Sequence, residues 1–260
     1  MKTLGRRVTA EFCGTLFLVA AVVGSGVMGE RLSGGNVAIA LLANTIATGA
    51  ALVGLILTFG PISGAHFNPA VTLADAMEHG IPWHEVPAYV VAQCLGGMAG
   101  AVVAHLMFGL RWYSLSSHAR NGSAQVFSEF IATFGLVSVI WGCSRVRSSV
   151  VPFAVGCYIT AAYWFTASTS FANPAVTIAR AFSDTFAGIR LADVPFFIIA
   201  QLAGAFSATI LFRWLIPTLP AHAADVLGKR LESEPNEQPM PPAFSSEIAL
   251  PKAPSALGHG

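Results

Sequence analysis

Long apolar runs separated by short polar segments dominate the chain up to about residue 216. Six of these runs are long enough for a helix to cross the hydrocarbon core of a bilayer, which takes about 20 residues. They lie near residues 9–29, 37–60, 87–109, 124–144, 149–168 and 194–216. The pattern therefore predicts an all-α membrane protein with six transmembrane helices.

The chain also contains an internal repeat. Residues 8–19 match residues 126–137 at a constant offset of 118, and residues 67–74 match residues 172–179 at an offset of 105. Each half, about 5–110 and about 122–217, then holds three spans and one short motif. Because three is odd, the second half must enter the membrane from the opposite side. This is an inverted repeat, an arrangement that places a pathway near the bilayer midplane.

The two motif segments are too short to span. Residues 68 to about 78 and 173 to about 183 would each form roughly 16 Å of helix. Each follows a stretch rich in small residues, 60–66 and 167–171. Irregular backbone is tolerated at membrane depth only where it is buried in protein or lines a watery cavity. The sequence therefore predicts two re-entrant half-helices.

Both half-helices begin with Asn-Pro-Ala, formed by Asn68, Pro69 and Ala70 and by Asn173, Pro174 and Ala175. Asn is a preferred N-cap, and Pro is favoured at the first helical position. Two such helices that meet by their N-termini would each present about half a positive charge. We expect this junction to repel cations and to accept a neutral solute, with the two Asn amides as donors. The alternative, two ordinary capped helices, is weakened by the register of the motifs with the repeat.

Two carboxylates, Glu11 and Glu129, lie inside predicted spans. A charged group there costs about 2.5–3.5 kcal/mol on insertion scales. No Lys or Arg lies deep in any span, so the unpaired N–H groups of the re-entrant loops are the expected partners. We interpret both glutamates as scaffold residues, with a proton relay as the alternative.

Composition narrows the function classes. The chain is 54% hydrophobic and 10% charged, and its 14 Lys/Arg and 13 Asp/Glu nearly cancel, so nothing indicates a nucleic-acid partner. Its four cysteines fall in apolar spans at no metal-like spacing. We therefore predict no metal, no cofactor and no enzymatic activity.

The loops and the C-terminus predict the topology. With both termini in the cytoplasm, nine Lys/Arg lie on that side and five on the other, as the positive-inside rule requires. The segment Glu232–Pro254 is rich in Pro, Glu and Ser. We interpret residues 218–260 as a disordered cytoplasmic tail and residues 1–217 as the membrane domain.

These features resemble the major intrinsic proteins, the aquaporins and aquaglyceroporins. The matching features are the Ala-Glu-Phe at 10–12, the segment Ser63–Thr72 and the second Asn-Pro-Ala. The resemblance covers roughly residues 5–216. It implies a right-handed bundle, a homotetramer in the inner (plasma) membrane with one pore per subunit, and a passive channel for small neutral solutes.

The family's selectivity filter uses residues at fixed distances from the two Asn, which here are Thr48, Ala161, Ser170 and Val176. Water channels of the family usually have an aromatic residue, a His, a small residue and an Arg there, and glycerol channels keep the Arg and two aromatics. This chain has no aromatic residue, no His and no Arg at the four positions. The resemblance therefore implies a wide, neutral filter like that of arsenic-resistance-associated aquaglyceroporins, which pass arsenite, methylated arsenicals, glycerol and water.

Several alternatives stay open. Arg180, one turn after Val176, either carries a positive charge to the outer vestibule or reaches the membrane interface or Asp184. A water-selective aquaporin is the nearest alternative function. A secondary transporter would share the inverted repeat, but it usually needs further intramembrane charges. An intramembrane enzyme and a non-transporting junction protein are less consistent with these motifs.

Overall fold

A computed structural model describes residues 3–216, all of its regular structure being helical within that range. Six helices have the length and hydropathy of membrane spans. They are α1 (Leu4–Leu32), α2 (Val37–Ser63), α4 (Val86–Met107), α5 (Ser123–Val146), α6 (Val151–Phe165) and α8 (Val194–Leu215). These helices confirm the predicted all-α membrane protein. The predicted tail, 218–260, lies outside the described residues.

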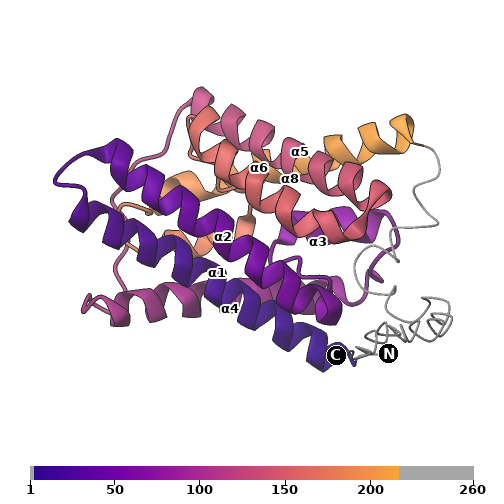
Figure 1. The fold of residues 1–260 in the computed structure, drawn as a ribbon, viewed down its shortest axis with the longest axis horizontal. Helices are drawn as coiled ribbons and strands as arrows, with labels where there is room; N and C mark the ends of the chain where they lie inside the picture. The colour runs from indigo at the N-terminus through magenta and orange to yellow at the C-terminus, as the bar shows by residue number, and fades with distance from the viewer. Residues whose placement is uncertain (1–2, 217–260) are drawn as a thin grey trace, which may run out of the picture. The chain divides into compact units, whose positions relative to one another are not determined.

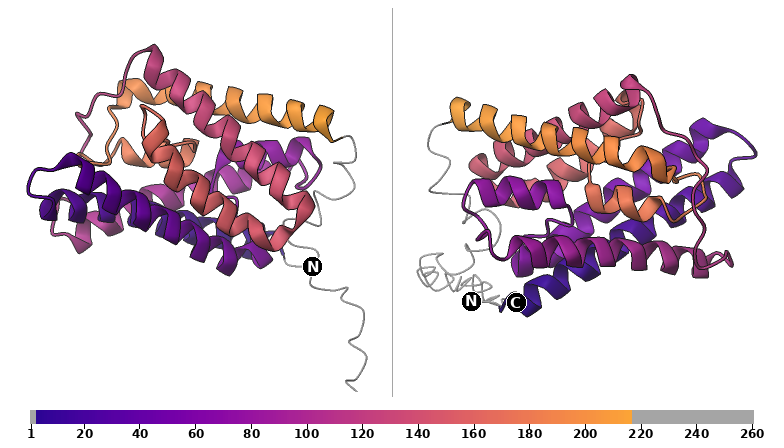
Figure 2. Two further views of the ribbon diagram at one scale, coloured as in Figure 1. Left: turned by 45° about the horizontal axis from the view of Figure 1, so that its top comes forward. Right: turned by 180° about the vertical axis from the view of Figure 1, so that it is seen from behind.

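Two short helices, α3 (Pro69–Met77) and α7 (Pro174–Arg180), lie between the long ones. They enter from opposite ends of the bundle and lie end to end in its middle (Figures 1 and 2). Helix α7 ends three residues earlier than the sequence predicted, because the backbone after Arg180 turns and Ser183 N–H bonds the Arg180 carbonyl. The two half-helices and the inverted repeat are otherwise as predicted.

The long helices pack in the same way in both halves. Helix α1 packs on α2 and α4, while α5 packs on α6 and α8, and α2 meets α6 between the halves. Glycines allow the closest approaches: a Cβ at Gly96 would lie 2.3 Å from Phe12 O, and one at Gly204 would lie 2.4 Å from Phe130 O. Small residues at helix contacts are typical of membrane bundles, where close van der Waals packing holds helices together.

We predict that Gly204→Ala destabilises the bundle. The new methyl would meet the backbone of α5, which cannot rotate away as a side chain could, so α8 must shift. Overpacking of this kind costs about 1–3 kcal/mol. A thermal unfolding midpoint measured in detergent should fall by several degrees.

The matched control is Gly142→Ala in α5, where the nearest atom to the new Cβ is 3.6 Å away on the Phe212 ring. We expect that variant to unfold like the original chain. Equal midpoints for the two variants would contradict the close-packing interpretation.

Candidate functional site

The two Asn-Pro-Ala segments cap their half-helices as predicted. Asn68 Oδ1 accepts a hydrogen bond from Ala70 N at 2.9 Å, and Asn173 Oδ1 accepts one from Ala175 N at 3.0 Å. Both prolines stand at the start of their helices, where a backbone N–H would have no partner within the helix, so its absence costs no hydrogen bond. The carbonyl oxygens of the Asn side chains are thus used within their own half-helices.

The amide nitrogens of the same side chains bridge the two halves. Asn68 Nδ2 donates to Ala172 O, and Asn173 Nδ2 donates to Phe67 O, each at 2.7 Å. These reciprocal bonds hold the two helix N-termini against each other, so their positive ends face the same point. Each Nδ2 carries two hydrogens, and one bond uses only one of them. The second hydrogen is therefore available to an oxygen atom at the junction.

The loops before the two Asn residues share an unusual backbone. Gly64, Ala65 and Phe67 have φ values of 93°, 51° and 49°. Their counterparts at the offset of 105 are Thr169, Ser170 and Ala172, with φ values of 60°, 48° and 48°. Left-handed conformations are unfavourable for residues with a Cβ and persist only where the surroundings hold them.

Glu11 supplies part of that constraint in the first half. Its carboxylate accepts four hydrogen bonds, from Ser63 Oγ (2.6 Å), His66 N (3.0 Å), Phe67 N (2.7 Å) and Gln93 Nε2 (2.8 Å). The side chain is fully buried in α1. It therefore satisfies two loop amides that have no helical partner.

Glu129 repeats this arrangement in the second half. It accepts bonds from Phe171 N and Ala172 N, each at 2.9 Å, and from Gln201 Nε2 at 2.6 Å. Within residues 3–216, neither Glu11 nor Glu129 forms an ion pair. Both carboxylates thus meet the loop amides that the sequence analysis proposed for them.

Three of the four filter positions inferred from family spacing are buried inside the bundle. Thr48 lies on the buried face of α2, Ser170 lies in the second loop, and Val176 lies in the first turns of α7. The Ser170 hydroxyl is buried without a hydrogen-bond partner among the described residues.

The fourth position, Ala161, does not reach this region. It is exposed on α6, on the same face as Phe153, Cys157 and Trp164. Helical residues are about 100° apart, so Ala161 lies roughly 160° around α6 from Tyr163. Tyr163 is buried, and its hydroxyl donates to Thr48 Oγ1 at 3.3 Å. The structure therefore places Tyr163, not Ala161, beside Thr48.

Sequence reasoning missed Tyr163 because family spacing counts residues along the chain and does not give the rotation of α6. One signal was present. Tyr163 is one of two tyrosines in a largely apolar helix, and a buried tyrosine hydroxyl usually requires a partner.

Arg180 reaches neither the membrane interface nor Asp184. It is only 2% exposed, its Nε donates to Ala187 O, and its guanidinium lies 3.4 Å from the centroid of the Phe171 ring. Asp184 instead accepts hydrogen bonds from Ser117 N and Oγ. The alternative in which Arg180 pairs with Asp184 is therefore wrong, and the alternative in which it reaches the membrane interface is excluded by its burial.

The opposite end of the site is held by a different arginine. Arg213 of α8 binds the Glu78 carboxylate and the Met77 carbonyl at the C-terminal end of α3. A cation at a helix C-terminus is favourable because it meets the negative end of the helix dipole. This contact fixes the end of α3 that lies away from the junction.

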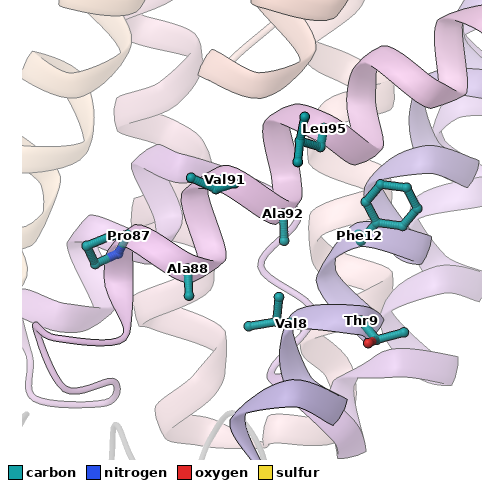
Figure 3. A pocket seen from close by; sticks show the side chains of 8 residues that line it. All are labelled: Val8, Thr9, Phe12, Pro87, Ala88, Val91, Ala92 and Leu95. Carbon is teal, nitrogen blue, oxygen red and sulfur yellow. The ribbon is translucent and has the colours of Figure 1, made fainter.

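Two further features of the described residues concern metal-binding clusters and surface cavities. No cluster of three His, Cys, Asp or Glu that would hold a metal ion occurs in the part of the chain that the structure describes. A cavity of about 580 Å³ lies elsewhere, between α1 and α4, and is open and apolar (Figure 3). Its lining includes Phe12, Val91 and Leu95 and none of the motif residues. It is a groove in the outer surface of the bundle.

The sequence is similar to known membrane proteins over most of its length. Residues 1–172 and 144–248 match the family model described as major intrinsic protein. The chain is 55% identical to the aquaglyceroporin AqpS of Rhizobium meliloti over 213 residues, 82% of this chain and 91% of that protein. It is 34% identical to the aquaporin NIP1-1 of Oryza sativa subsp. japonica over 205 residues, 77% of this chain and 70% of the relative.

The structure is similar to a solved one. The X-ray structure of the aquaglyceroporin from Plasmodium falciparum aligns with a TM-score of 0.66, covering 84% of this chain and 100% of that one. The identity between the two is 20%, so this likeness concerns the fold.

We predict that Glu129→Gln and Glu11→Gln reduce stability more than selectivity. An amide offers one acceptor oxygen where the carboxylate offered two, so loop N–H groups lose partners. Each unsatisfied buried donor costs about 1–3 kcal/mol. The yield of folded protein and its unfolding midpoint in detergent should both fall.

Glu30→Gln is the control, because Glu30 is an exposed carboxylate on the same helix as Glu11. It should behave like the original chain. A Glu129→Gln protein that folds normally but has altered proton flux would favour the relay and reject the scaffold role.

Proposed function

The chain belongs to the major intrinsic protein family, and we propose that it is an aquaglyceroporin with a neutral filter that passes arsenite, methylated arsenicals and glycerol in addition to water. The coarser statement follows from the family: the chain is a passive membrane channel for small solutes, and not an enzyme. The finer statement concerns the chemistry of the solute.

The reciprocal bonds between the Asn residues are the observation that carries this proposal. They bring two helix N-termini together in the interior of the bundle and leave an N–H of each amide for a passing oxygen. The positive ends of the helices disfavour a cation at that point. A small uncharged molecule with an oxygen atom suits the junction best.

We infer that the filter is formed by Thr48, Tyr163, Ser170 and Val176. Three of these side chains carry hydroxyls and one is apolar, and none is charged. Hydroxylated neutral solutes match this combination, because the three hydroxyl-bearing side chains can bond the hydroxyls of the solute and the apolar Val176 can contact its remaining surface. Glycerol and undissociated arsenite are both of this type. Tyr163 makes the ring narrower than the four positions from family spacing implied, yet it adds no charge.

The remaining parts of the proposal concern assembly and orientation. We place the chain in the inner (plasma) membrane with both termini in the cytoplasm, which the distribution of Lys and Arg supports. We propose a homotetramer with one pore in each subunit, with residues 1–217 as the channel domain. A water-selective channel is the alternative within the family.

Stopped-flow light scattering on proteoliposomes tests the proposal. Water, glycerol and arsenite gradients are applied separately to the same vesicles. We expect all three solutes to cross at rates that rise linearly with the gradient and ignore ion gradients. Water flux without glycerol or arsenite flux would support the water-selective alternative, and saturable, ion-coupled flux would indicate a transporter.

We predict that Val176→Arg lowers glycerol and arsenite flux strongly and water flux less. The long cationic side chain would enter a region where the present residue is apolar and only 5% exposed. It would narrow the ring and favour the smallest solute. Rates per reconstituted protein measure the effect, and unchanged glycerol and arsenite rates would reject the assignment of Val176 to the filter.

A second prediction separates Tyr163 from Ala161. Tyr163→Phe removes the hydroxyl that bonds Thr48, so the glycerol-to-water ratio should change by about two- to tenfold, the effect of one hydrogen bond. Ala161→Leu adds bulk on the outward face of α6 and should leave the ratio unchanged. If Ala161→Leu blocks glycerol while Tyr163→Phe does nothing, the assignment from family spacing is right and ours is wrong.

A further inference from the structure

Two arginines from separate segments lie against one aromatic ring. The Arg180 guanidinium lies 3.4 Å from the centroid of Phe171, and that of Arg120 lies 4.9 Å from it. Arg120 comes from the connection between α4 and α5, whereas Arg180 ends α7. Cations are attracted to the faces of aromatic rings, which stabilises both positions. Two like charges are thus held close together beside the second re-entrant loop.

The contacts of Arg120 tie it to the backbone just before the filter. Its Nη1 donates to Ser168 O at 3.1 Å and to Thr169 Oγ1 at 3.4 Å, while its Nε donates to Gly188 O at 2.7 Å. Ser168 and Thr169 immediately precede Ser170. The guanidinium therefore lies next to the segment that forms one wall of the proposed filter.

Arg180 approaches the same region from the other side of the motif. It lies one helical turn beyond Val176 on the same face of α7. Its Nε is bound to the Ala187 carbonyl, and its Nη1 is buried with no partner among the described residues. Val176 occupies the position at which the family usually has an arginine, so Arg180 places a guanidinium about one turn away from that position.

Neither charge is neutralised by a direct ion pair. Within residues 3–216, no carboxylate lies in salt-bridge contact with Arg120 or Arg180. The nearby acids have other partners: Glu129 binds the loop amides, Asp184 binds Ser117, and Asp193 pairs with Arg190 and accepts Arg120 N–H. Burial lowers the pKa of Arg120 to about 10, so it remains protonated at neutral pH.

Buried charges are costly unless they are paired, so two buried arginines without an ion pair require an explanation. Arg120 is 8% exposed and Arg180 is 2% exposed. A charge in this low-dielectric setting acts on its surroundings over several ångströms without touching them. The two guanidinium groups therefore act through their field on an ion in the proposed filter.

We propose that Arg120 and Arg180 together replace the charge of the missing filter arginine and make the outer entrance of the channel exclude cations. This inference rests on the proposed channel function and adds two selectivity-determining residues to it. The size of the solute is then limited by the proposed filter, formed by Thr48, Tyr163, Ser170 and Val176. The two arginines beside the filter exclude cations.

A purely structural role is the competing explanation, because both arginines also hold loop carbonyls. Charge and geometry are separable by substitution. Lysine keeps the charge but loses the planar fork, whereas glutamine loses the charge and keeps an amide donor. Arg31 gives a matched control, because it too lies over a phenylalanine ring, Phe108, at 5.2 Å and donates to the carbonyl of that residue at 3.0 Å.

The experiment compares cation leak with neutral flux in the same proteoliposomes. A pH dye reports voltage-driven proton entry under a clamped potential, a potassium-sensitive dye reports K⁺ entry, and light scattering reports glycerol. The ratio of cation leak to glycerol rate corrects for the amount of functional protein. The variants are Arg120→Gln, Arg180→Gln, the double variant, the two Lys variants and Arg31→Gln.

We expect the leak ratio to rise by about tenfold or more in the double Gln variant, because two positive charges no longer oppose the entry of a cation. The Lys variants and Arg31→Gln should keep the original ratio. Adding Val176→Arg to the double variant should restore exclusion. If the double variant does not fold, Arg180→Gln alone must raise the ratio.

Three results would overturn the inference. The first is rapid proton or K⁺ entry through the original chain, which needs no variant to observe. The second is an unchanged ratio in the Gln variants that still pass glycerol. The third is an equal leak in the Lys and Gln variants, which would show that the shape of the arginine side chains, and not their charge, controls the leak. Absence of glycerol flux in the original chain would instead reject the proposed function.

Discussion

The re-entrant loops depend on one constraint: backbone amides at membrane depth must find partners inside the protein, because lipid offers none. Half-helices that stop at the midplane leave loop N–H groups outside any helical ladder. Glu11 and Glu129 bind those groups, and Gln93 and Gln201 link the same carboxylates to Thr72 and Thr177 in the half-helices. The loop amides gain hydrogen-bond acceptors, and the buried carboxylates gain the donors that compensate for their loss of water.

The central junction follows from this arrangement. With the loops held in left-handed conformations, the carbonyls of Phe67 and Ala172 are placed where the opposite Asn amide reaches them. The close packing of α1 on α4 and of α5 on α8 then sets the distance between the two halves. The hydrogen bonds between the two Asn residues and the opposite loops therefore depend on the close packing of the outer helices. A shift of either helix pair would separate the two Asn residues.

The sequence predicts the parts of this protein that are set by local pattern. The six spans follow from apolar length, the half-helices follow from Asn-Pro-Ala, and the partners of Glu11 and Glu129 follow from the need to satisfy buried amides. Ala161 could not be placed in this way, because counting from Asn173 does not give the rotation of α6. Arg180 could not be placed either, since its partners Phe171 and Ala187 are brought to it by loops whose path is a tertiary property.

Moving the positive charge out of the filter ring changes what the ring is able to do. An arginine in the ring supplies charge, hydrogen bonds and bulk together. Replacing it by a smaller residue widens the pore but also removes the charge that repels cations. With Arg120 and Arg180 held on Phe171 and on loop carbonyls, the positive charge is supplied by residues other than those of the proposed ring. Val176 is then free to be small and apolar. Size selection and charge selection become separate properties of neighbouring residues, and this separation allows a pore to admit larger neutral solutes while it still refuses cations.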